Sequence, residues 1–220
     1  MCRVMQYRIR LATVVIVTKN ADLEKASNGV MNAAFGFGGQ KCSACSRVYV
    51  QNEVAEKFIS KLVEKTKNLK IGMPWEREVF LGPVINKEAK TKFEDAVNIA
   101  KKEGEILIGG SISTLSELEN GHFVEPTIVT KLPEDHKLVK EELFLPFLCI
   151  QRYDDFDDAI KLANQTEYGL TAGIFSNDKK QLDEFFSKIQ AGVVYANRSA
   201  SATTAALVSS QPFVGWKHSG

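Results

Sequence analysis

Short apolar segments alternate along this chain with amphipathic segments of ten or more residues, and this alternation limits the folds open to it. Two strands that are joined through a helix lie parallel in one sheet, whereas antiparallel strands need only a tight turn. Such crossovers are right-handed and place helices on the faces of the sheet. We therefore expect an α/β fold, with a mostly parallel sheet and helices on both faces.

The expected strands are apolar runs, several of them rich in β-branched residues. They cover residues 13–18, 46–50, 105–108, 147–153, 172–175 and 193–196, the last as a core strand. The expected helices have apolar residues at helical spacing, and two of them follow a capping Asn or Asp. They run from Asn20 or Asp22 to about residue 34, over 53–69 and 87–103, from Asp154 or Asp155 to about residue 164, and over 178–190. The core face of the last helix is expected to comprise Leu182, Phe185, Phe186 and Ile189.

The composition is that of a globular protein, because 44% of the 220 residues are hydrophobic and 25% are charged. The net charge is only +1, so the chain lacks the basic surface that a nucleic-acid partner requires. No uncharged apolar run approaches the ~20 residues that span a bilayer. We therefore expect neither a nucleic-acid nor a membrane partner.

The beginning of the chain permits two interpretations. Arg3, Arg8 and Arg10 precede the apolar run Leu11–Val17, an order that signal peptides share. No small-x-small cleavage site follows the run, however, and its Val-Val-Ile-Val sequence favours a buried strand. Four cysteines are too few for a disulfide scaffold, so we expect a reducing, cytoplasmic setting.

The segment Gly38–Cys45 is the strongest candidate for chemistry. Two glycines before Cys42 let a ligand approach the backbone, and a stabilised thiolate there is a nucleophile. A buried structural cysteine is the alternative. The C-x-x-C spacing of Cys42 and Cys45 also suggests a redox pair or half of a zinc site. A redox pair should open a helix, whereas a strand follows here, and the other cysteines and histidines are too isolated to complete a zinc site. We expect no metal.

Two further segments combine polar and aromatic residues in loops. Glu141 and Glu142 stand just before the apolar run 147–153, where a polar loop is the simple interpretation. Phe213 and Trp216 lie in a loop marked by glycine and proline near the end of the chain. Aromatic residues in such a loop either line a small-molecule pocket or plug the core beneath it.

Together, these three segments resemble the signature motifs of the aldehyde dehydrogenase superfamily. Gly39–Cys42 is similar to G-Q-x-C, Glu141–Pro146 to E-E-x-F-G-P, and Pro212–Gly220 to P-F-G-G-x-K-x-S-G. The resemblance covers residues 14–220, as a catalytic domain after a divergent segment 1–13. Gly39–Arg47 and Thr204–Val208 resemble most the 1-pyrroline-5-carboxylate dehydrogenases, which oxidise glutamate semialdehyde to glutamate in proline catabolism.

The resemblance implies roles for individual residues. Cys42 would be the catalytic thiol, which forms a thioester with the aldehyde substrate. Glu142 would hydrogen-bond the nicotinamide ribose of NAD or NADP, and Phe144 would pack beside the nicotinamide. The resemblance also implies a homo-oligomer in the full-length family. The residues implied to bind substrate are Ser43, Ala205, Ala206 and Phe213.

Several features depart from the family pattern. The G-x-G-x-x-G fingerprint of the NAD-binding domain is absent, and Leu145 and Val214 replace glycines of the motifs. The family's general base is a Glu 34 residues before the nucleophile, and that position is Arg8 here. We therefore expect a truncated chain that lacks the NAD-binding domain and is inactive by itself. The alternatives are a non-catalytic remnant, a subunit whose partner chain supplies the NAD-binding half, and a residual thiol esterase that needs only Cys42 and an oxyanion site.

Overall fold

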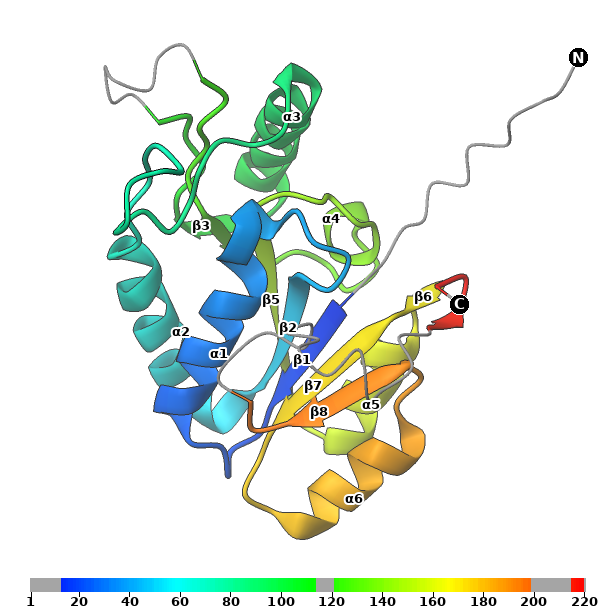
Figure 1. The fold of residues 1–220 in the computed structure, drawn as a ribbon. Helices are drawn as coiled ribbons and strands as arrows, with labels where there is room; N and C mark the ends of the chain where they lie inside the picture. The colour runs from blue at the N-terminus through cyan, green and yellow to red at the C-terminus, as the bar shows by residue number, and fades with distance from the viewer. Residues whose placement is uncertain (1–12, 114–120, 199–214, 220) are drawn as a thin grey trace, which may run out of the picture.

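The fold is built on a seven-stranded sheet in which only one pair of neighbouring strands is antiparallel (Figure 1). The computed structural model describes residues 13–113, 121–198 and 215–219. The strand order is β3-β4-β5-β2-β1-β7-β8, and β3 with β4 is the antiparallel pair. The strands are β1 (Thr13–Val17), β2 (Cys45–Gln51), β3 (Glu105–Ile108), β4 (Thr127–Thr130), β5 (Phe147–Tyr153), β7 (Thr171–Phe175) and β8 (Val193–Ala196). A separate two-stranded ladder pairs β6 (Tyr168–Gly169) with β9 (Trp216–Lys217).

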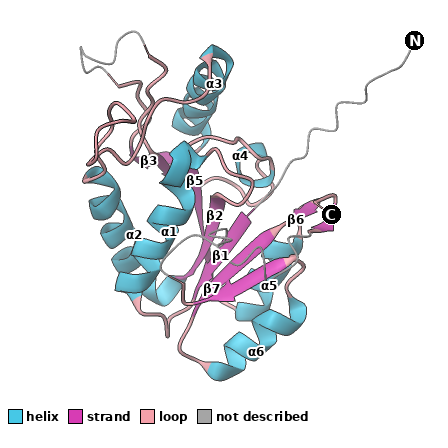
Figure 2. Ribbon diagram, viewed as in Figure 1, coloured by secondary structure: helices cyan, strands magenta, loops and turns pink. Residues whose placement is uncertain are grey.

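Helices cover both faces of the sheet, as the alternation predicts (Figure 2). Residues from α1 and α2 pack on one face, and residues from α3, α4, α5 and α6 pack on the other. No helix in the described ranges is long and apolar enough to cross a bilayer. The helices are α1 (Leu23–Phe35), α2 (Asn52–Lys67), α3 (Lys87–Glu103), α4 (Lys137–Lys140), α5 (Phe156–Asn164) and α6 (Lys179–Lys188).

Capping side chains set where four of these helices begin. The side chains of Asp22, Asn86, Asp155 and Asp178 accept backbone N–H groups in the first turns of α1, α3, α5 and α6. These N–H groups have no partner within their own helix, so a capping oxygen satisfies them. The sequence prediction of these helix starts is therefore confirmed.

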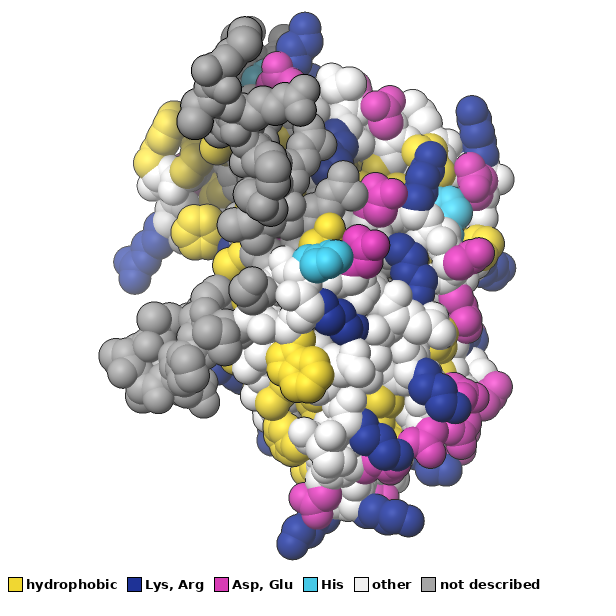
Figure 3. All heavy atoms as spheres, turned by 90° about the vertical axis from the view of Figure 1, so that its right-hand side faces the viewer, with side chains coloured by type: hydrophobic (Ala, Val, Ile, Leu, Met, Phe, Trp, Pro, Cys, Tyr) yellow, Lys and Arg dark blue, Asp and Glu magenta, His cyan; other side chains and the backbone are white. Residues whose placement is uncertain are grey.

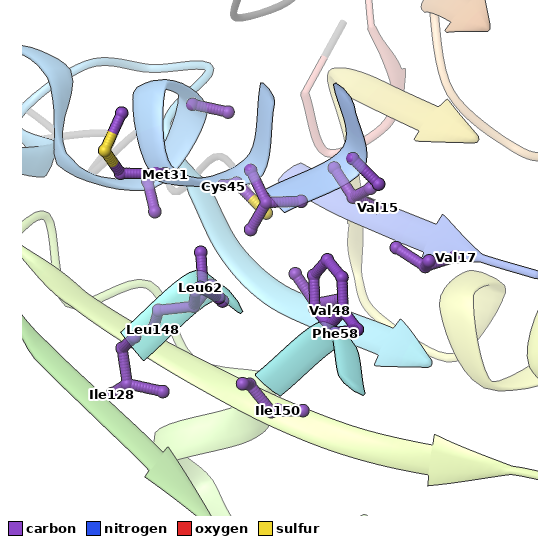
Figure 4. Close-up of a cluster of buried hydrophobic side chains, with 14 of the residues drawn as sticks. Val15, Val17, Met31, Cys45, Val48, Phe58, Leu62, Ile128, Leu148 and Ile150 are labelled. Carbon is purple, nitrogen blue, oxygen red and sulfur yellow. The ribbon is translucent and has the colours of Figure 1, made fainter. Parts of the chain in front are cut away.

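The core divides into two layers because successive strand residues point to opposite faces. Val15 and Val48 face α1 and α2, in the cluster shown in Figure 4, whereas Val14 and Tyr49 face the other layer. Cys45 departs from this alternation. The register of β1 with β2 shifts between Cys45 and Arg47, and this bulge places Cys45 in the same layer as Val48.

Some expectations are corrected. Phe186 is 46% exposed and lies edge-on to the buried Phe185, so it does not belong to the core face of α6. Adjacent helical residues are about 100° apart, so Phe186 points away from the face on which Phe185 is buried. β8 is an edge strand with half-buried residues, not a core strand. The sequence analysis did not predict β4, α4 or the β6–β9 ladder.

Candidate functional site

The three motif segments meet at one end of the sheet. Because β2 and β5 are parallel neighbours, the loops that precede them emerge at the same edge. Cys42 lies in the first loop and Glu142 in the second. β6 directly precedes β7, and its antiparallel partner β9 therefore brings the end of the third motif to the same end of the sheet. The sequence predicts each segment separately, and the strand order brings them together.

The turn that carries Cys42 begins with a left-handed stretch of backbone. Phe37, Gly38 and Gly39 have φ angles of 58°, 62° and 66°. After Gln40, the N–H of Ala44 donates to the carbonyl oxygen of Lys41 at 3.1 Å and closes a tight turn. Cys42 occupies this turn and is half-buried. Its thiol is thus held at a fixed backbone position ahead of β2.

Gly39 brings the Cys42 turn against the loop that carries Glu142. A Cβ at Gly39 would lie 2.2 Å from the carbonyl oxygen of Leu145 and 2.9 Å from the nitrogen of Pro146. No side chain fits at this distance, so the two backbones pack directly on each other. The glycine of the G-Q-x-C motif therefore allows this contact as well as the positive φ angle.

A small hollow lies beside this contact, between neighbours of Cys42 in the turn and the loop that carries Glu142. Cys42 itself does not line it. Glu142 is half-buried there, and Phe144 is 44% exposed with a φ angle of 59°. A phenylalanine in this left-handed region carries backbone strain of about 1–2 kcal/mol. The hollow is lined by Gly39, Lys41, Ala44, Glu142, Phe144 and Leu145, among others.

Lys92 is a contributor to this site that the sequence did not reveal. Its Nζ donates to the carbonyl oxygens of Glu142 and Leu143, at 3.2 and 2.6 Å. These bonds hold the backbone between the two predicted cofactor-binding residues, Glu142 and Phe144. Lys92 lies on the exposed side of α3, where the helical pattern indicates only solvent contact.

The three described cysteines differ in their surroundings. Burial raises the pKa of both Cys45 and Cys149 to about 12, so these thiols stay protonated at neutral pH. Cys42 is the one described cysteine that is not fully buried. Burial also lowers the pKa of the adjacent Lys41, while the Cys42 thiolate acts in the opposite direction. In the described ranges, no group of three or more His, Cys, Asp or Glu side chains is placed to hold a metal ion.

The other predicted site residues lie partly outside the described ranges. Ser43 is fully buried directly after Cys42. Ala205, Ala206 and Phe213 fall in the segment 199–214, outside the described residues. The end of the third motif is described: Trp216–Lys217 pairs with Tyr168–Gly169, and the N–H of Gly169 donates to Ser219 Oγ at 3.0 Å.

Comparison with known proteins identifies the family. The family model described as "Aldehyde dehydrogenase family" matches residues 12–220. The chain belongs to the aldehyde dehydrogenase family. Among the curated relatives, 1-pyrroline-5-carboxylate dehydrogenases of Anoxybacillus flavithermus and Bacillus cytotoxicus are 39% and 41% identical to it over 206 residues. This confirms the family resemblance that the three motifs indicate.

Solved structures of aldehyde dehydrogenases share the fold. A 1-pyrroline-5-carboxylate dehydrogenase from Thermus with bound NAD matches with a TM-score of 0.88 at 35% identity. A betaine aldehyde dehydrogenase from Staphylococcus aureus in complex with NAD⁺ matches with a TM-score of 0.88 at 32% identity. The matches cover 95% and 94% of this chain, but 39% and 41% of those chains. The chain likewise spans 39% of the length of the two curated relatives, and 94% of this chain is aligned in each case.

Proposed function

We propose that this chain is the thiol-bearing part of an NAD- or NADP-dependent aldehyde dehydrogenase that oxidises glutamate semialdehyde, the open form of 1-pyrroline-5-carboxylate, to glutamate. The observation that carries the proposal is the half-buried Cys42 in a tight turn, packed against the loop of Glu142 and Phe144. The names of the relatives support the substrate, and residues 14–220 would form this catalytic domain after the divergent segment 1–13.

The proposed chemistry begins at the Cys42 sulfur. Its thiolate attacks the aldehyde carbon, a C–S bond forms, and the carbonyl electron pair moves onto oxygen. N–H donors around the turn stabilise this oxyanion, a contribution that is often the largest one in acyl chemistry. After oxidation, the acyl group remains on Cys42 as a thioester until water releases the acid and restores the thiol.

The residues beside the hollow fit one end of the cofactor. Glu142 is a half-buried carboxylate suited to ribose hydroxyls, and Phe144 offers an exposed aromatic face for the nicotinamide. Lys92 holds the backbone that carries both. When bound, NAD or NADP supplies the two-electron acceptor that the oxidation of an aldehyde requires.

The substrate would be recognised through its α-carboxylate. By the family resemblance, Ala205, Ala206 and the Ser43 hydroxyl would receive this carboxylate, because small side chains favour an anion-binding turn and a hydroxyl is a donor. Phe213 would pack against the carbon chain. Each charge-assisted hydrogen bond contributes about 1.5–3 kcal/mol. A reconstituted enzyme should therefore prefer glutamate semialdehyde over a plain aliphatic aldehyde by at least about tenfold in kcat/KM.

A second candidate is a subunit that acts only with a partner chain carrying the NAD-binding half. One observation favours it. Phe37 and Ile85 are 84% and 81% exposed, and the backbone N–H of Ile85 donates to the side chain of Gln40. Large apolar side chains exposed beside the Cys42 turn would be covered by such a partner.

Alkylation mapping tests the catalytic assignment. Iodoacetamide at neutral pH should label Cys42 ahead of Cys45 and Cys149, because burial keeps the latter two thiols protonated. Labelling is read by mass spectrometry of the tryptic peptides, and Cys42→Ser is the control that should lose the fast phase. Preferential labelling of Cys45 would contradict the assignment of Cys42 as the nucleophile.

A further inference from the structure

Arg47 is a fully buried cation close to the Cys42 turn. Its side chain is 1% exposed, and its Nη2 donates to the carbonyl oxygen of Ala163 and to Thr166 Oγ1, both at 3.1 Å. Its Nε and Nη1 have no hydrogen-bond partner. No carboxylate in the described part of the chain forms an ion pair with it. A buried guanidinium in such surroundings destabilises the folded state, because protein hydrogen bonds replace only part of its hydration.

Two further cations bind the same short segment. Lys217 Nζ donates to the carbonyl oxygens of Asn164 and Thr166, the latter at 2.9 Å, and Lys140 Nζ donates to Gln165 Oε1 at 3.2 Å. The three cations therefore gather at the C-terminal end of α5, where free carbonyls and the helix dipole give negative potential. Burial lowers the pKa of both lysines, and the charge of Arg47 lowers it further.

This segment lies between two of the motif segments. On one side is Arg47, the first residue of β2 to pair with β1 after the bulge that follows the Cys42 turn. On the other side is Lys217 of the third motif, whose strand pairs with Tyr168–Gly169. Thr166 joins the two sides, because its Oγ1 accepts from Arg47 and donates to the carbonyl oxygen of Tyr168 at 2.9 Å.

Lys217 also has an unusual backbone. Its φ angle is 59°, in the left-handed region that is strained for residues other than glycine. The ammonium contacts with the end of α5 offset this strain. On the side of the molecule where β6 and the C-terminal end lie, basic and acidic side chains are interspersed (Figure 3).

We propose that Arg47 and Lys217 are positioning residues that hold the Cys42 turn in register with the third motif, through the segment Ala163–Thr166. The proposal rests on the proposed function of Cys42 as the nucleophile. A buried arginine with unpartnered N–H groups is a poor stabiliser, and replacing such a cation with an apolar side chain is often neutral or stabilising. Its function in this chain is therefore the placement of the turn.

The test compares stability with the reactivity of Cys42. Arg47→Met and Lys217→Met each remove one of the two cations, whereas Lys217→Arg keeps a positive charge at residue 217. Lys61→Met is the control, because it removes an exposed lysine that pairs with Glu24. For each full-length chain, the rate of Cys42 alkylation by iodoacetamide is measured from about pH 6 to about pH 10, a range that includes the ordinary thiol pKa. Thermal unfolding is recorded in parallel.

Arg47→Met and Lys217→Met should each lower the rate of Cys42 alkylation at neutral pH by at least about threefold. Their Tm should stay within about 3 °C of the unmodified chain. Lys217→Arg and Lys61→Met should keep the original profile. If Arg47→Met does not fold, the comparison of Lys217→Met with Lys217→Arg tests the positioning role.

An unchanged Cys42 profile in Lys217→Met would overturn the positioning role, whatever its Tm. The same holds for a profile that changes equally in Lys217→Met and Lys217→Arg. If Cys42 of the unmodified chain reacts no faster than Cys45, the proposed function itself fails, and the positioning role fails with it. The two failures are therefore distinguishable.

Discussion

The contact at Gly39 leads to a prediction with a matched control next to it. Gly38 and Gly39 both have left-handed φ angles, of 62° and 66°. A Cβ at Gly38 would meet only the flexible side chain of Gln40, at 3.3 Å. A Cβ at Gly39 would lie 2.2 Å from the backbone oxygen of Leu145. Alanine at each position therefore separates the effect of φ from the effect of the contact.

The magnitudes follow from these distances. Gly38→Ala should lower the free energy of unfolding by about 1 kcal/mol, since left-handed strain exceeds the entropy that alanine removes from the unfolded chain. Gly39→Ala bears the same strain and must also push the two backbones apart by about 1 Å. Overpacking of this kind costs about 1–3 kcal/mol, so the total should be about 2–4 kcal/mol.

Urea unfolding at equilibrium measures both variants, with the slope m compared to exclude changes in the unfolded state. Cys42 alkylation reports whether the turn has moved. Gly39→Ala should lose stability beyond Gly38→Ala and alter the alkylation rate. Equal losses for the two variants would refute the close packing of the turn against Leu145.

Three further outcomes are expected. Lys92→Met should increase hydrogen exchange in the loop around Glu142, because two bonds to its carbonyls are lost; protection equal to that of the unmodified chain would contradict the role of Lys92. The pKa of Glu24 is lowered to about 2, chiefly by its hydrogen bonds to two lysines of α2, so its contribution to stability is present above pH 4.5 and is lost as the pH falls toward 2. E24Q should therefore make the free energy of unfolding depend less on pH between about 4.5 and 2. The same pH dependence in E24Q and in the unmodified chain would argue against this role of Glu24. The pure chain should produce no NADH or NADPH from glutamate semialdehyde, because Arg8 cannot act as a base; steady production that Cys42→Ala abolishes would show the opposite.

Local patterns in the sequence predicted much of the fold. The bounds of α3, β3 and β5 match the prediction, since each has a clear apolar period and a capping or turn residue at its start. The alternation of strands and helices along the chain predicted a mostly parallel sheet, as the structure has it. Phe186 shows the limit of this approach, because periodicity defines a helix face but not how far the sheet extends beneath it.

The candidate site was predictable only in part. Cys42, Glu142 and Phe144 were found through the motifs, each within a few residues of a strand. The contacts of Lys92 and Arg47 could not be predicted from the sequence, because they are long-range. Lys92 contacts Glu142, 50 positions away, and Arg47 contacts Thr166, 119 positions away. A signal existed for Arg47, since a charged residue directly precedes the apolar residues Val48–Val50 of the same strand. Lys92, by contrast, occupies an ordinary solvent-exposed position on its helix.

The position of β1 in the sheet has a consequence for biosynthesis. β1 lies between β2 and β7, and Thr13 Oγ1 contacts Thr171 Oγ1 at 2.7 Å across 158 positions of sequence. A ribosome that adds about 5–20 residues per second needs roughly 10–30 s to deliver that second neighbour. During this interval the backbone N–H and C=O groups along one edge of β1 have no neighbouring strand to pair with. The nascent chain must therefore be protected from pairing with other chains until β7 emerges.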